Sequence, residues 1–370
     1  MNFLIDQQEQ LNELEATINE LRSKAVDSNE IAIIAVDTEF LREKTYNAKL
    51  CLVQLGINEH QYCIDVLNIR DLTLLKNLLA DEAILKLFHA ARQDMEVIYQ
   101  TLDVIPKPIF DTQLAAAFCG MDMQIGYGAI VSNKLNVELP KTQSRTDWTK
   151  RPLSSEQVEY AGDDVAYLES LYELLLEELQ SVDRYEWFIE ELDAYYDPLL
   201  YKVDPKLAYQ RLSGGALNVE QQYLLKVLAQ WREETAQQRN IPRTWVIKDD
   251  RLYDLAIQRP KTSNEVAKMG VFGKKSVKYW APEIMTVIDN VKVEDKRLWN
   301  RVEPLTKAQK SVCNKMMQQL KTHSEEYNIS QGLLGTRRDI EGLFRYRKSK
   351  KMLQGWRNDL IGVSLLELIE

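Results

Sequence analysis

Three short stretches place acidic side chains at spacings that could bind metal ions. In "AVDTEF", Asp37 and Glu39 stand two residues apart directly after a run of apolar residues. Along a strand, residues i and i+2 project to one face, so both carboxylates should reach the space just past the end of a buried strand. A lone pair of this kind could equally be one acid capping a turn and another in solvent. The interpretation therefore depends on further acids nearby.

Asp94 and Asp164 supply those further acids. Asp94 enters a predicted helix directly after "AILKLFHA" (83–90), which we expect to be a strand parallel to the first. In "EYAGDDVAYL", Tyr160 and Asp164 stand four residues apart, on one face of a helix. Alone, Asp94 could be an acid favoured by the helix dipole, and Asp163 a surface residue. Together, the order DxE, D, YxxxD predicts one acidic site at the sheet edge where α/β proteins bind ligands.

Four carboxylates in one site repel one another unless they bind cations or protons. Their hard oxygen atoms suit Mg²⁺ or Mn²⁺. Neither the three histidines nor the four scattered cysteines show the spacing of a zinc site, and we expect the cysteines to be free thiols. The residue types therefore favour a site for divalent cations.

The hydrophobic pattern around these acids alternates between strands and helices. Apolar residues at helical spacing predict a helix that Asp6 caps, a helix over 92–102, and one long helix from Glu156 to Leu179. Short apolar runs predict strands at 2–5, 31–36, 50–57, 61–67 and 83–90. The third and fourth of these should form a hairpin around the polar stretch "NEH". This order predicts an α/β domain with a mixed central sheet and helices on both faces.

The second half of the chain is helical in pattern. After "SGG" at 213–215, turn signals separate helices as far as residue 370 and divide them into two units. We predict one α/β domain followed by two all-α domains, with boundaries at 1–205, 206–295 and 296–370.

Charge is divided unevenly between the two halves. Residues 1–205 hold 17 Lys and Arg against 37 Asp and Glu, a net charge of −20, whereas residues 206–370 hold 30 against 19, a net charge of +11. An acidic half could bind cations and a basic half could bind phosphates, although both could simply be solvated surfaces. No apolar run approaches the roughly 20 residues needed to cross a bilayer, and the first residues do not read as a leader peptide. We expect a cytoplasmic, monomeric protein without membrane contacts.

The acidic stretches resemble the ribonuclease D family, within the DEDDy subgroup of 3′–5′ exonucleases with a ribonuclease H-like fold. The similarity covers nearly the whole chain, and its sequence blocks, in order, are "VDTEFLREKTYNAKLCLVQLG", "FHAARQDMEVI", "FDTQLAAAF" and "TDWTKRPLSSEQVEYAGDDVAYL". Residues 217–290 resemble an HRDC domain, a helical module that binds nucleic acids, and residues 300–370 resemble a second, more divergent HRDC domain.

The resemblance implies a metal-dependent 3′–5′ exoribonuclease that releases 5′-mononucleotides and trims tRNA precursors and other small structured RNAs. It implies that two divalent cations, Mg²⁺ or Mn²⁺, are bound by Asp37, Glu39, Asp94 and Asp164, with Asp37 as the candidate bridge between them. Tyr160, whose ordinary pKa is about 10, is better suited to orienting the attacking water than to deprotonating it. Gly162 and Asp163 depart from the family's last motif, but the four-residue spacing selects Asp164.

Further residues match family positions that lie near the terminal nucleotide: Arg42, Thr45, Tyr46 and Gln54. His89 could also contact RNA, or simply be satisfied by hydrogen bonds at a strand end. The basic runs "GKKSVK" (273–278) and "RYRKSKK" (345–351) are candidate phosphate contacts.

Three alternative functions remain open from the sequence alone. A DNA-directed exonuclease of the same superfamily would use the same acids. A catalytically inactive RNA-binding protein would be free to lose them, and the set is complete. A helicase accessory would need a separate motor, because the chain has no GxxxxGK[ST] loop.

Overall fold

The computed structural model describes residues 2–140, 146–273 and 275–369. They form two compact units. The first contains Met1–Leu41, Leu50–Pro198 and Leu305–Glu370, and the second contains Arg42–Lys49 and Leu199–Pro304. The second unit therefore interrupts the first at two places in the sequence.

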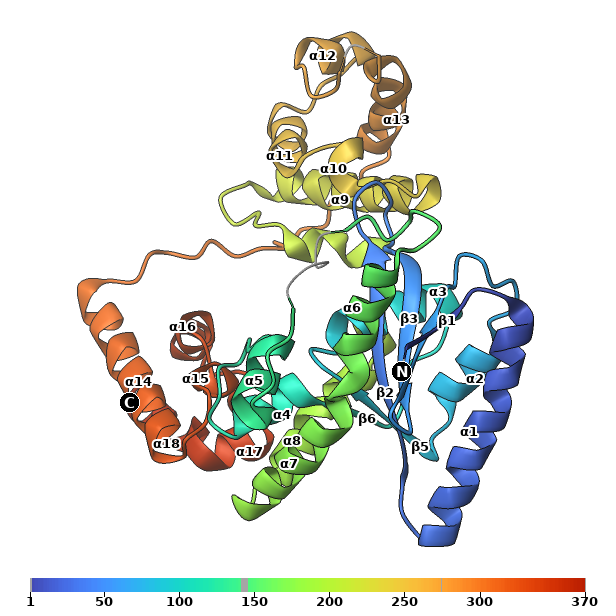
Figure 1. Cartoon of the computed structure of the whole chain (residues 1–370). Coiled ribbons are helices and arrows are strands. Elements are labelled where there is room, and N and C mark those ends of the chain that lie inside the picture. Colours follow the sequence, from blue (N-terminus) through green and yellow to red (C-terminus); the bar gives the residue numbers. More distant parts are fainter. Residues whose placement is uncertain (1, 141–145, 274, 370) are drawn as a thin grey trace. The chain divides into compact units, whose positions relative to one another are not determined.

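The first unit is built on the predicted mixed sheet, whose strand order is β1-β4-β3-β2-β5-β6 (Figure 1). Strands β1 and β4, β2 and β5, and β5 and β6 pair in parallel, whereas β3 and β4 form an antiparallel hairpin. The strands are β1 (Asn2–Ile5), β2 (Ala32–Leu41), β3 (Lys49–Ile57), β4 (His60–Ile64), β5 (Ile84–Phe88) and β6 (Ile109–Asp111). The hairpin turns at Asn58 and Glu59, both with positive φ, as a two-residue turn requires.

Strand β2 is longer than the apolar run indicates. It continues from Ala32 to Leu41, so Asp37 and Glu39 lie within the strand and not past its end as predicted. The acids interrupt the hydrophobic pattern without ending the backbone pairing. The alternation of side chains along the strand, on which the prediction rested, is unaffected.

Helices cover both faces of this sheet, as predicted (Figure 1). The helices are α1 (Gln8–Ser28), α2 (Thr73–Ala80), α3 (Arg92–Leu102), α4 (Thr112–Phe118), α5 (Tyr127–Leu135), α6 (Ser155–Ala166), α7 (Leu168–Ser181) and α8 (Tyr185–Asp193). Helix α1 is capped at Gln7, not at Asp6 as predicted. The side chain of Gln10 reaches back to accept hydrogen bonds from the backbone N–H groups of both residues.

The long helix predicted over 156–179 is two helices. Helix α6 ends at Ala166 and α7 begins at Leu168, with Tyr167 between them at φ −114° and ψ 4°. The backbone N–H of Tyr167 donates a hydrogen bond to the hydroxyl of Tyr127. The prediction was wrong here because the apolar spacing continues across the break, and the partner that stabilises the break lies 40 residues away in the sequence.

The C-terminal helices belong to the same compact unit as the sheet. They are α14 (Lys307–Glu326), α15 (Gln331–Leu334), α16 (Arg337–Tyr346), α17 (Gly355–Arg357) and α18 (Val363–Glu367). Trp356 stacks on Trp187 of α8 with ring centroids 5.0 Å apart, and Arg357 forms an ion pair with Glu191 of the same helix. Arg184 donates hydrogen bonds to the carbonyl oxygens of Tyr327 and Asn328. The predicted boundaries of the three domains stay predictions.

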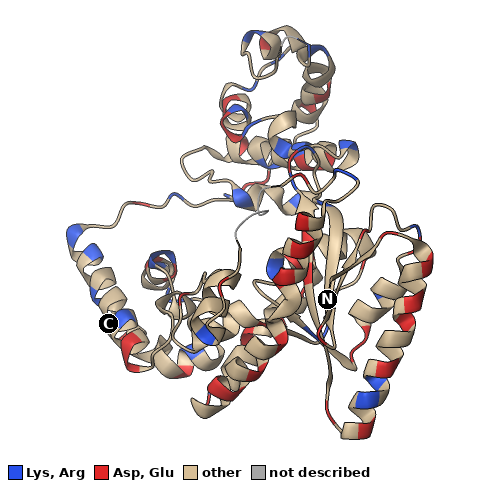
Figure 2. Ribbon diagram, in the orientation of Figure 1, with Lys and Arg blue, Asp and Glu red and all other residues tan. Residues whose placement is uncertain are grey.

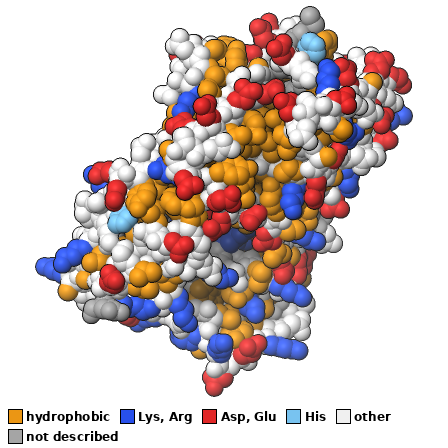
Figure 3. Space-filling view, turned by 90° about the horizontal axis from the view of Figure 1, so that it is seen from below, with side chains coloured by type: hydrophobic (Ala, Val, Ile, Leu, Met, Phe, Trp, Pro, Cys, Tyr) orange, Lys and Arg blue, Asp and Glu red, His pale blue; other side chains and the backbone are white. Residues whose placement is uncertain are grey.

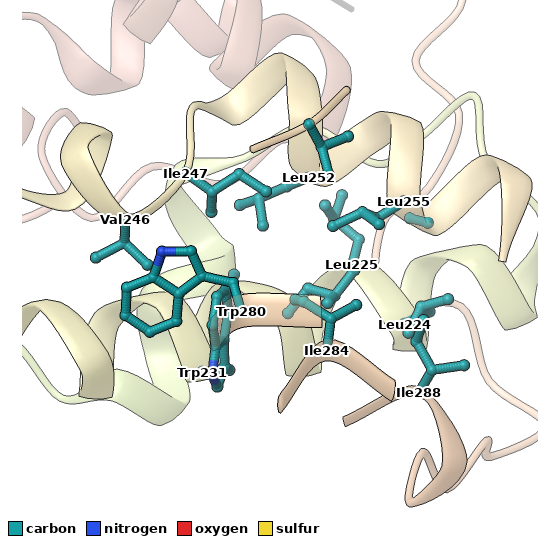
Figure 4. Close-up of a cluster of buried hydrophobic side chains, with 14 of the residues drawn as sticks. Leu224, Leu225, Trp231, Val246, Ile247, Leu252, Leu255, Trp280, Ile284 and Ile288 are labelled. Carbon is teal, nitrogen blue, oxygen red and sulfur yellow. The ribbon is translucent and has the colours of Figure 1, made fainter. Parts of the chain in front are cut away.

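The second unit is a helical domain with its own core. Its helices are α9 (Val219–Arg239), α10 (Arg243–Val246), α11 (Asp249–Gln258), α12 (Ser263–Lys268) and α13 (Val277–Asp289). Trp231 and Trp280 meet edge to face at its centre, among aliphatic side chains of α9, α11 and α13 (Figure 4). The buried amide of Gln222 ties α9 to the chain that leaves the unit, since it accepts from the N–H groups of Leu298 and Trp299.

Charge follows the division that the sequence predicts. Acidic side chains are frequent along α1, α6 and α7, and basic side chains lie near the start of α14 (Figure 2). On the face seen in Figure 3, apolar areas are bordered by acidic and basic side chains. Within the described ranges, no helix combines the length and the apolar character needed to span a membrane. Cys51, Cys63, Cys119 and Cys313 are buried free thiols.

Replacing Trp356 by alanine should destabilise the first unit by about 3–5 kcal/mol, because it removes a buried aromatic ring that packs on Trp187 and Phe118. Chemical denaturation followed by tryptophan fluorescence and by far-UV circular dichroism measures the loss. Val363→Ala, on an exposed side chain of α18, is the matched control and should leave the midpoint unchanged. Equal midpoints for both variants would contradict this packing.

Candidate metal centre and catalytic site

Three carboxylates from two elements converge on one face of the sheet. Asp37 and Glu39 project from β2, and Asp164 projects from α6. One oxygen atom from each lies within 4.8 Å of the others. The structure therefore brings together three of the four predicted acids, and it selects Asp164 over its neighbour Asp163.

Small residues allow α6 to approach the sheet closely enough for this convergence. A Cβ atom on Gly56 of β3 would lie 2.9 Å from Cβ of Ala35 and 3.2 Å from the carbonyl oxygen of Val165. No larger residue fits between strand and helix at Gly56 without moving one of them.

The fourth acid, Asp94, lies beside this group. It occupies the first turn of α3, is 7% exposed, and accepts a 2.5 Å hydrogen bond from the hydroxyl of Thr38. The turn that leads into α3 is held by Asp111, whose carboxylate accepts from the backbone N–H groups of Ala90 and Ala91, each at 3.0 Å. Asp94 therefore has a fixed position next to β2, although it is outside the group of three converging carboxylates.

Burial and mutual repulsion raise the pKa values of all four acids. Burial raises the pKa of Glu39 to about 9 and that of Asp164 to about 7, with further contributions from the neighbouring carboxylates. Burial also raises the pKa values of Asp37 and Asp94 well above the ordinary range, and each is raised further by another carboxylate of the site. The site thus resists holding four negative charges unless positive charge is brought to it.

Tyr160 lies one helical turn before Asp164 and beside a cavity of about 650 Å³. Both residues line this cavity, together with residues of the segment 126–140. Burial raises the pKa of the Tyr160 hydroxyl, so it stays protonated at neutral pH and can donate a hydrogen bond. Tyr127 of α5, which is partly buried, also lines the cavity, and its hydroxyl accepts from the backbone N–H of Tyr167.

Two further predicted residues, Gln54 and His89, have different environments. The ring of His89 is bonded on both sides, with Nδ1 2.9 Å from the Thr112 hydroxyl and Nε2 2.9 Å from the Ile125 carbonyl oxygen. A contact with RNA would have to replace one of these bonds. Gln54 is fully buried, and neither amide atom has a hydrogen-bond partner among the described residues. Its burial separates it from any direct contact with RNA in this conformation.

Arg42, Thr45 and Tyr46 belong to the second unit, in the segment Arg42–Lys49 between β2 and β3. The Tyr46 hydroxyl donates to the buried carboxylate of Glu233 and accepts from Gln237. Its backbone N–H donates to the side chain of Asn240 at 3.1 Å. Tyr46 is thus anchored to α9. The match of Tyr46 to a family position near the terminal nucleotide did not indicate this contact. A role for these three residues in binding substrate stays a prediction.

Residues that shape the site were missed where their partners are distant in sequence. Thr38 lies between the two acids of the first stretch, and Trp148 and Arg151 lie in the last block, but no local pattern indicates what they contact. The break after α6, where Tyr127 binds, was hidden by continuous apolar spacing. The only available signal was that Thr38, Trp148 and Arg151 lie within the sequence blocks that resemble the family.

The donor set fits hard divalent cations. All the converging ligand atoms are carboxylate oxygens, and within the ranges that the structure describes no histidine or cysteine joins the group. The four acids together carry more negative charge than their surroundings neutralise. Mg²⁺ and Mn²⁺ prefer such oxygen ligands, whereas zinc prefers nitrogen and sulfur.

Comparisons with known proteins agree with this geometry. A 3′–5′ exonuclease family model matches residues 4–180, and the HRDC domain model matches residues 221–288. Ribonuclease D of Zymomonas mobilis is 35% identical over 345 residues, which cover 91% of this chain and 88% of that protein. Ribonuclease D of Nitrobacter hamburgensis is 33% identical, with 96% and 94% covered. The crystal structure of Escherichia coli RNase D, described as an exoribonuclease involved in structured RNA processing, is 28% identical with a TM-score of 0.86, covering 100% of this chain and 99% of that one.

Divalent cations should stabilise the protein more as the pH rises. Without them, carboxyl groups whose pKa values are raised by folding hold protons that the unfolded chain releases, so stability is lost as the pH rises through about 7 for Asp164 and about 9 for Glu39. Cations replace those protons. The increase in melting temperature with Mg²⁺ should therefore grow between about pH 6 and about pH 9.

Calorimetry with Mg²⁺ and with EDTA measures this difference. The Asp164→Asn variant removes one charge from the site and should show a smaller increase and a flatter pH profile. An increase that is the same at every pH, or one that Asp164→Asn leaves unchanged, would show that the cations bind elsewhere.

Proposed function

The chain belongs to the ribonuclease D family of 3′–5′ exoribonucleases, and from this membership we propose the roles of its site residues and the RNAs that it processes. It is a hydrolase that shortens RNA from the 3′ end. The convergence of Asp37, Glu39 and Asp164 within 4.8 Å supports the assignment of the reaction to this site. The family membership gives the reaction, and the geometry supports our assignment of these residues to it.

We assign the binding of two divalent cations, Mg²⁺ or Mn²⁺, to four carboxylates. Asp37, Glu39, Asp94 and Asp164 would hold the two ions, with Asp37 as the candidate ligand shared by both. Bound there, the cations would supply a reactive water at neutral pH and neutralise the charge that develops on the phosphate and the leaving 3′ oxygen. The raised pKa values of the acids support this role, because the site is destabilised without positive charge.

Tyr160 would orient the attacking water. Its hydroxyl stays protonated and faces the cavity that Asp164 also lines. A phenol of high pKa is a poor base but a good hydrogen-bond donor and acceptor, so it can hold a water molecule in line with the scissile phosphate. The cavity of about 650 Å³ is within the size range of small-molecule sites and would receive the terminal nucleotide.

The substrates that we propose are tRNA precursors and other small structured RNAs with 3′ extensions. The excess of basic residues in the second half of the chain supports contact with RNA backbones outside the catalytic site. We further propose that the protein acts as a monomer in the cytoplasm. The family membership supports RNA over DNA as the substrate.

In the second unit, exposed aromatic and basic side chains lie together. Trp245, 59% exposed, lines a cavity of about 350 Å³ with Lys248 and Arg251. Lys278 lies over the ring of Tyr279, which is 60% exposed. Such pairs bind single-stranded nucleic acid by stacking and by charge. Of the predicted phosphate-binding runs, 273–278 lies here, with Lys274 outside the described residues.

The second basic run, 345–351, is partly engaged in structure. Lys351 donates to the carbonyl oxygen of Gly332, and Arg347 donates to that of Ile369. Lys348 and Lys350 are exposed. They are the members of this run that we propose for phosphate contacts.

A 5′-labelled RNA with a tRNA-like stem and a 3′ trailer should be shortened stepwise from its 3′ end in the presence of Mg²⁺ or Mn²⁺. EDTA and the Asp37→Ala substitution should each abolish the ladder, because they remove the cations or the bridging ligand. The DNA version of the same molecule should be degraded more slowly. Binding without shortening under every metal condition would refute the catalytic proposal and leave an RNA-binding protein.

Trp245→Ala should weaken the use of structured RNA without affecting the chemical step. Loss of one stacked base costs about 1–3 kcal/mol, so KM on the tRNA-like substrate should rise by about five-fold or more. KM on a short single strand that reaches only the catalytic site, and kcat on both, should stay unchanged. Ile257→Ala, an exposed apolar residue of the same unit, serves as control. An equal rise in KM on both substrates would exclude the proposed contact.

A further inference from the structure

Arg151 makes an unusually complete set of bonds close to the catalytic helix. Its Nε and Nη2 bind the two carboxylate oxygens of Asp65 at 2.5 and 2.6 Å. Its remaining N–H groups donate to the carbonyl oxygens of Trp148, Lys150 and Cys51, at 2.8, 2.7 and 3.0 Å. All five hydrogen bonds of the guanidinium are therefore made inside the protein, with none left for a phosphate.

Asp65 is equally well placed to hold Arg151. It follows β4, is 1% exposed, and also accepts from the backbone N–H of Leu67 and the side chain of Asn68. A bidentate pair between a guanidinium and a carboxylate defines both distance and orientation, which a lysine cannot reproduce. The pair thus connects the end of β4 rigidly to the segment before α6.

This segment runs directly into the helix that carries Tyr160. Asp147 accepts from the backbone N–H and the hydroxyl of Thr149, which closes a tight turn. Ser154, three residues after Arg151, is the N-cap of α6 and forms a capping box with Gln157. The bonds of Arg151 therefore hold the chain three residues before the cap of α6.

Trp148 transmits the same constraint to Tyr160 itself. It is 3% exposed and packs with Cys51, Cys63 and Ala161. Its ring centroid lies 6.3 Å from that of Tyr160, with the rings 34° apart. Among the described residues, nothing hydrogen-bonds to the Tyr160 hydroxyl, so its ring is held by packing alone.

We propose that Arg151 and Asp65 are positioning residues for catalysis, which hold the Tyr160 ring in its reactive orientation through Trp148 and the start of α6. The proposal rests on the role of Tyr160 in orienting the attacking water. Neither Arg151 nor Asp65 lines the cavity or belongs to the converging carboxylates. The proposal therefore requires their effect on the reaction to pass through the position of Tyr160.

A double-mutant cycle separates positioning from general stability. Arg151→Lys keeps the charge and loses the bidentate geometry, and Tyr160→Phe removes the hydroxyl that is positioned. We expect Arg151→Lys to lower kcat on a short single-stranded RNA at least about ten-fold, because displacement of about 1 Å is costly in a reactive geometry. KM and the affinity for Mn²⁺, measured by titration calorimetry, should stay within about two-fold.

In the Tyr160→Phe background, the same lysine substitution should have little further effect on kcat, since there is no hydroxyl left to misplace. Arg22→Lys is the matched control. Arg22, in α1, binds the carboxylate of Asp81 through Nε and Nη2 at 2.9 and 2.6 Å. This variant should leave kcat unchanged in both backgrounds.

The outcomes distinguish this proposal from the proposed role of Tyr160. If Arg151→Lys lowers kcat by the same factor with and without the Tyr160 hydroxyl, the pair acts on stability or on the metal ligands and the positioning proposal is overturned. If Tyr160→Phe alone leaves kcat unchanged, the role of Tyr160 fails instead. If Arg151→Lys does not fold, Trp148→Phe takes its place in the same cycle. The positioning proposal requires the effect of Trp148→Phe on kcat to disappear in the Tyr160→Phe background.

Discussion

The repulsion between four carboxylates in one partly buried site is the constraint on which the rest of the nuclease unit depends. Each acid is held by a different part of the fold: two by the pleat of β2, one by the first turn of α3, and one by α6. Burial and the neighbouring carboxylates together raise their pKa values, so the folded chain favours protonated acids unless cations neutralise the site. Gly56, which allows α6 to approach the sheet, and Asp111, which holds the turn before α3, both help to keep the acids close together.

The chain passes between the two compact units more than once, because the second unit contains two separate segments of the sequence. The segment Arg42–Lys49 leaves β2 shortly after Glu39, packs in the second unit, and returns as β3. Tyr46 binds α9 there through Glu233 and Gln237. The helical domain is therefore joined to both strands that carry the face of the catalytic site. The C-terminal helices, by contrast, pack directly on α8 within the first unit, through Trp356 and Arg357.

Periodicity predicted the parts of the structure that depend on near neighbours in the chain. The shared face of Asp37 and Glu39 follows from the strand, and that of Tyr160 and Asp164 follows from the helix. The mixed sheet, the hairpin and α3 were likewise predicted. Two of the errors lie where groups outside the local pattern decide: the break at Tyr167 depends on Tyr127, and the length of β2 depends on pairing with neighbouring strands. Tyr127 lies 40 residues before Tyr167, outside the range of any local hydrophobic pattern. The cap of α1 is a local error, because Gln7 and Gln10 take the role predicted for Asp6.

Tyr160 illustrates why the most distant contacts matter for function. A side chain whose polar atom must meet the substrate cannot be held by a hydrogen bond at that same atom, so its orientation has to come from its apolar body. Trp148 supplies the packing surface, and Arg151 holds Trp148 by its carbonyl oxygen while it binds Asp65. The four carboxylates differ from Tyr160 in this respect, because bound cations would attract them into position. Tyr160, which stays neutral, therefore depends on packing against Trp148 for its orientation, whereas positive charge would hold together the carboxylates that we propose as metal ligands.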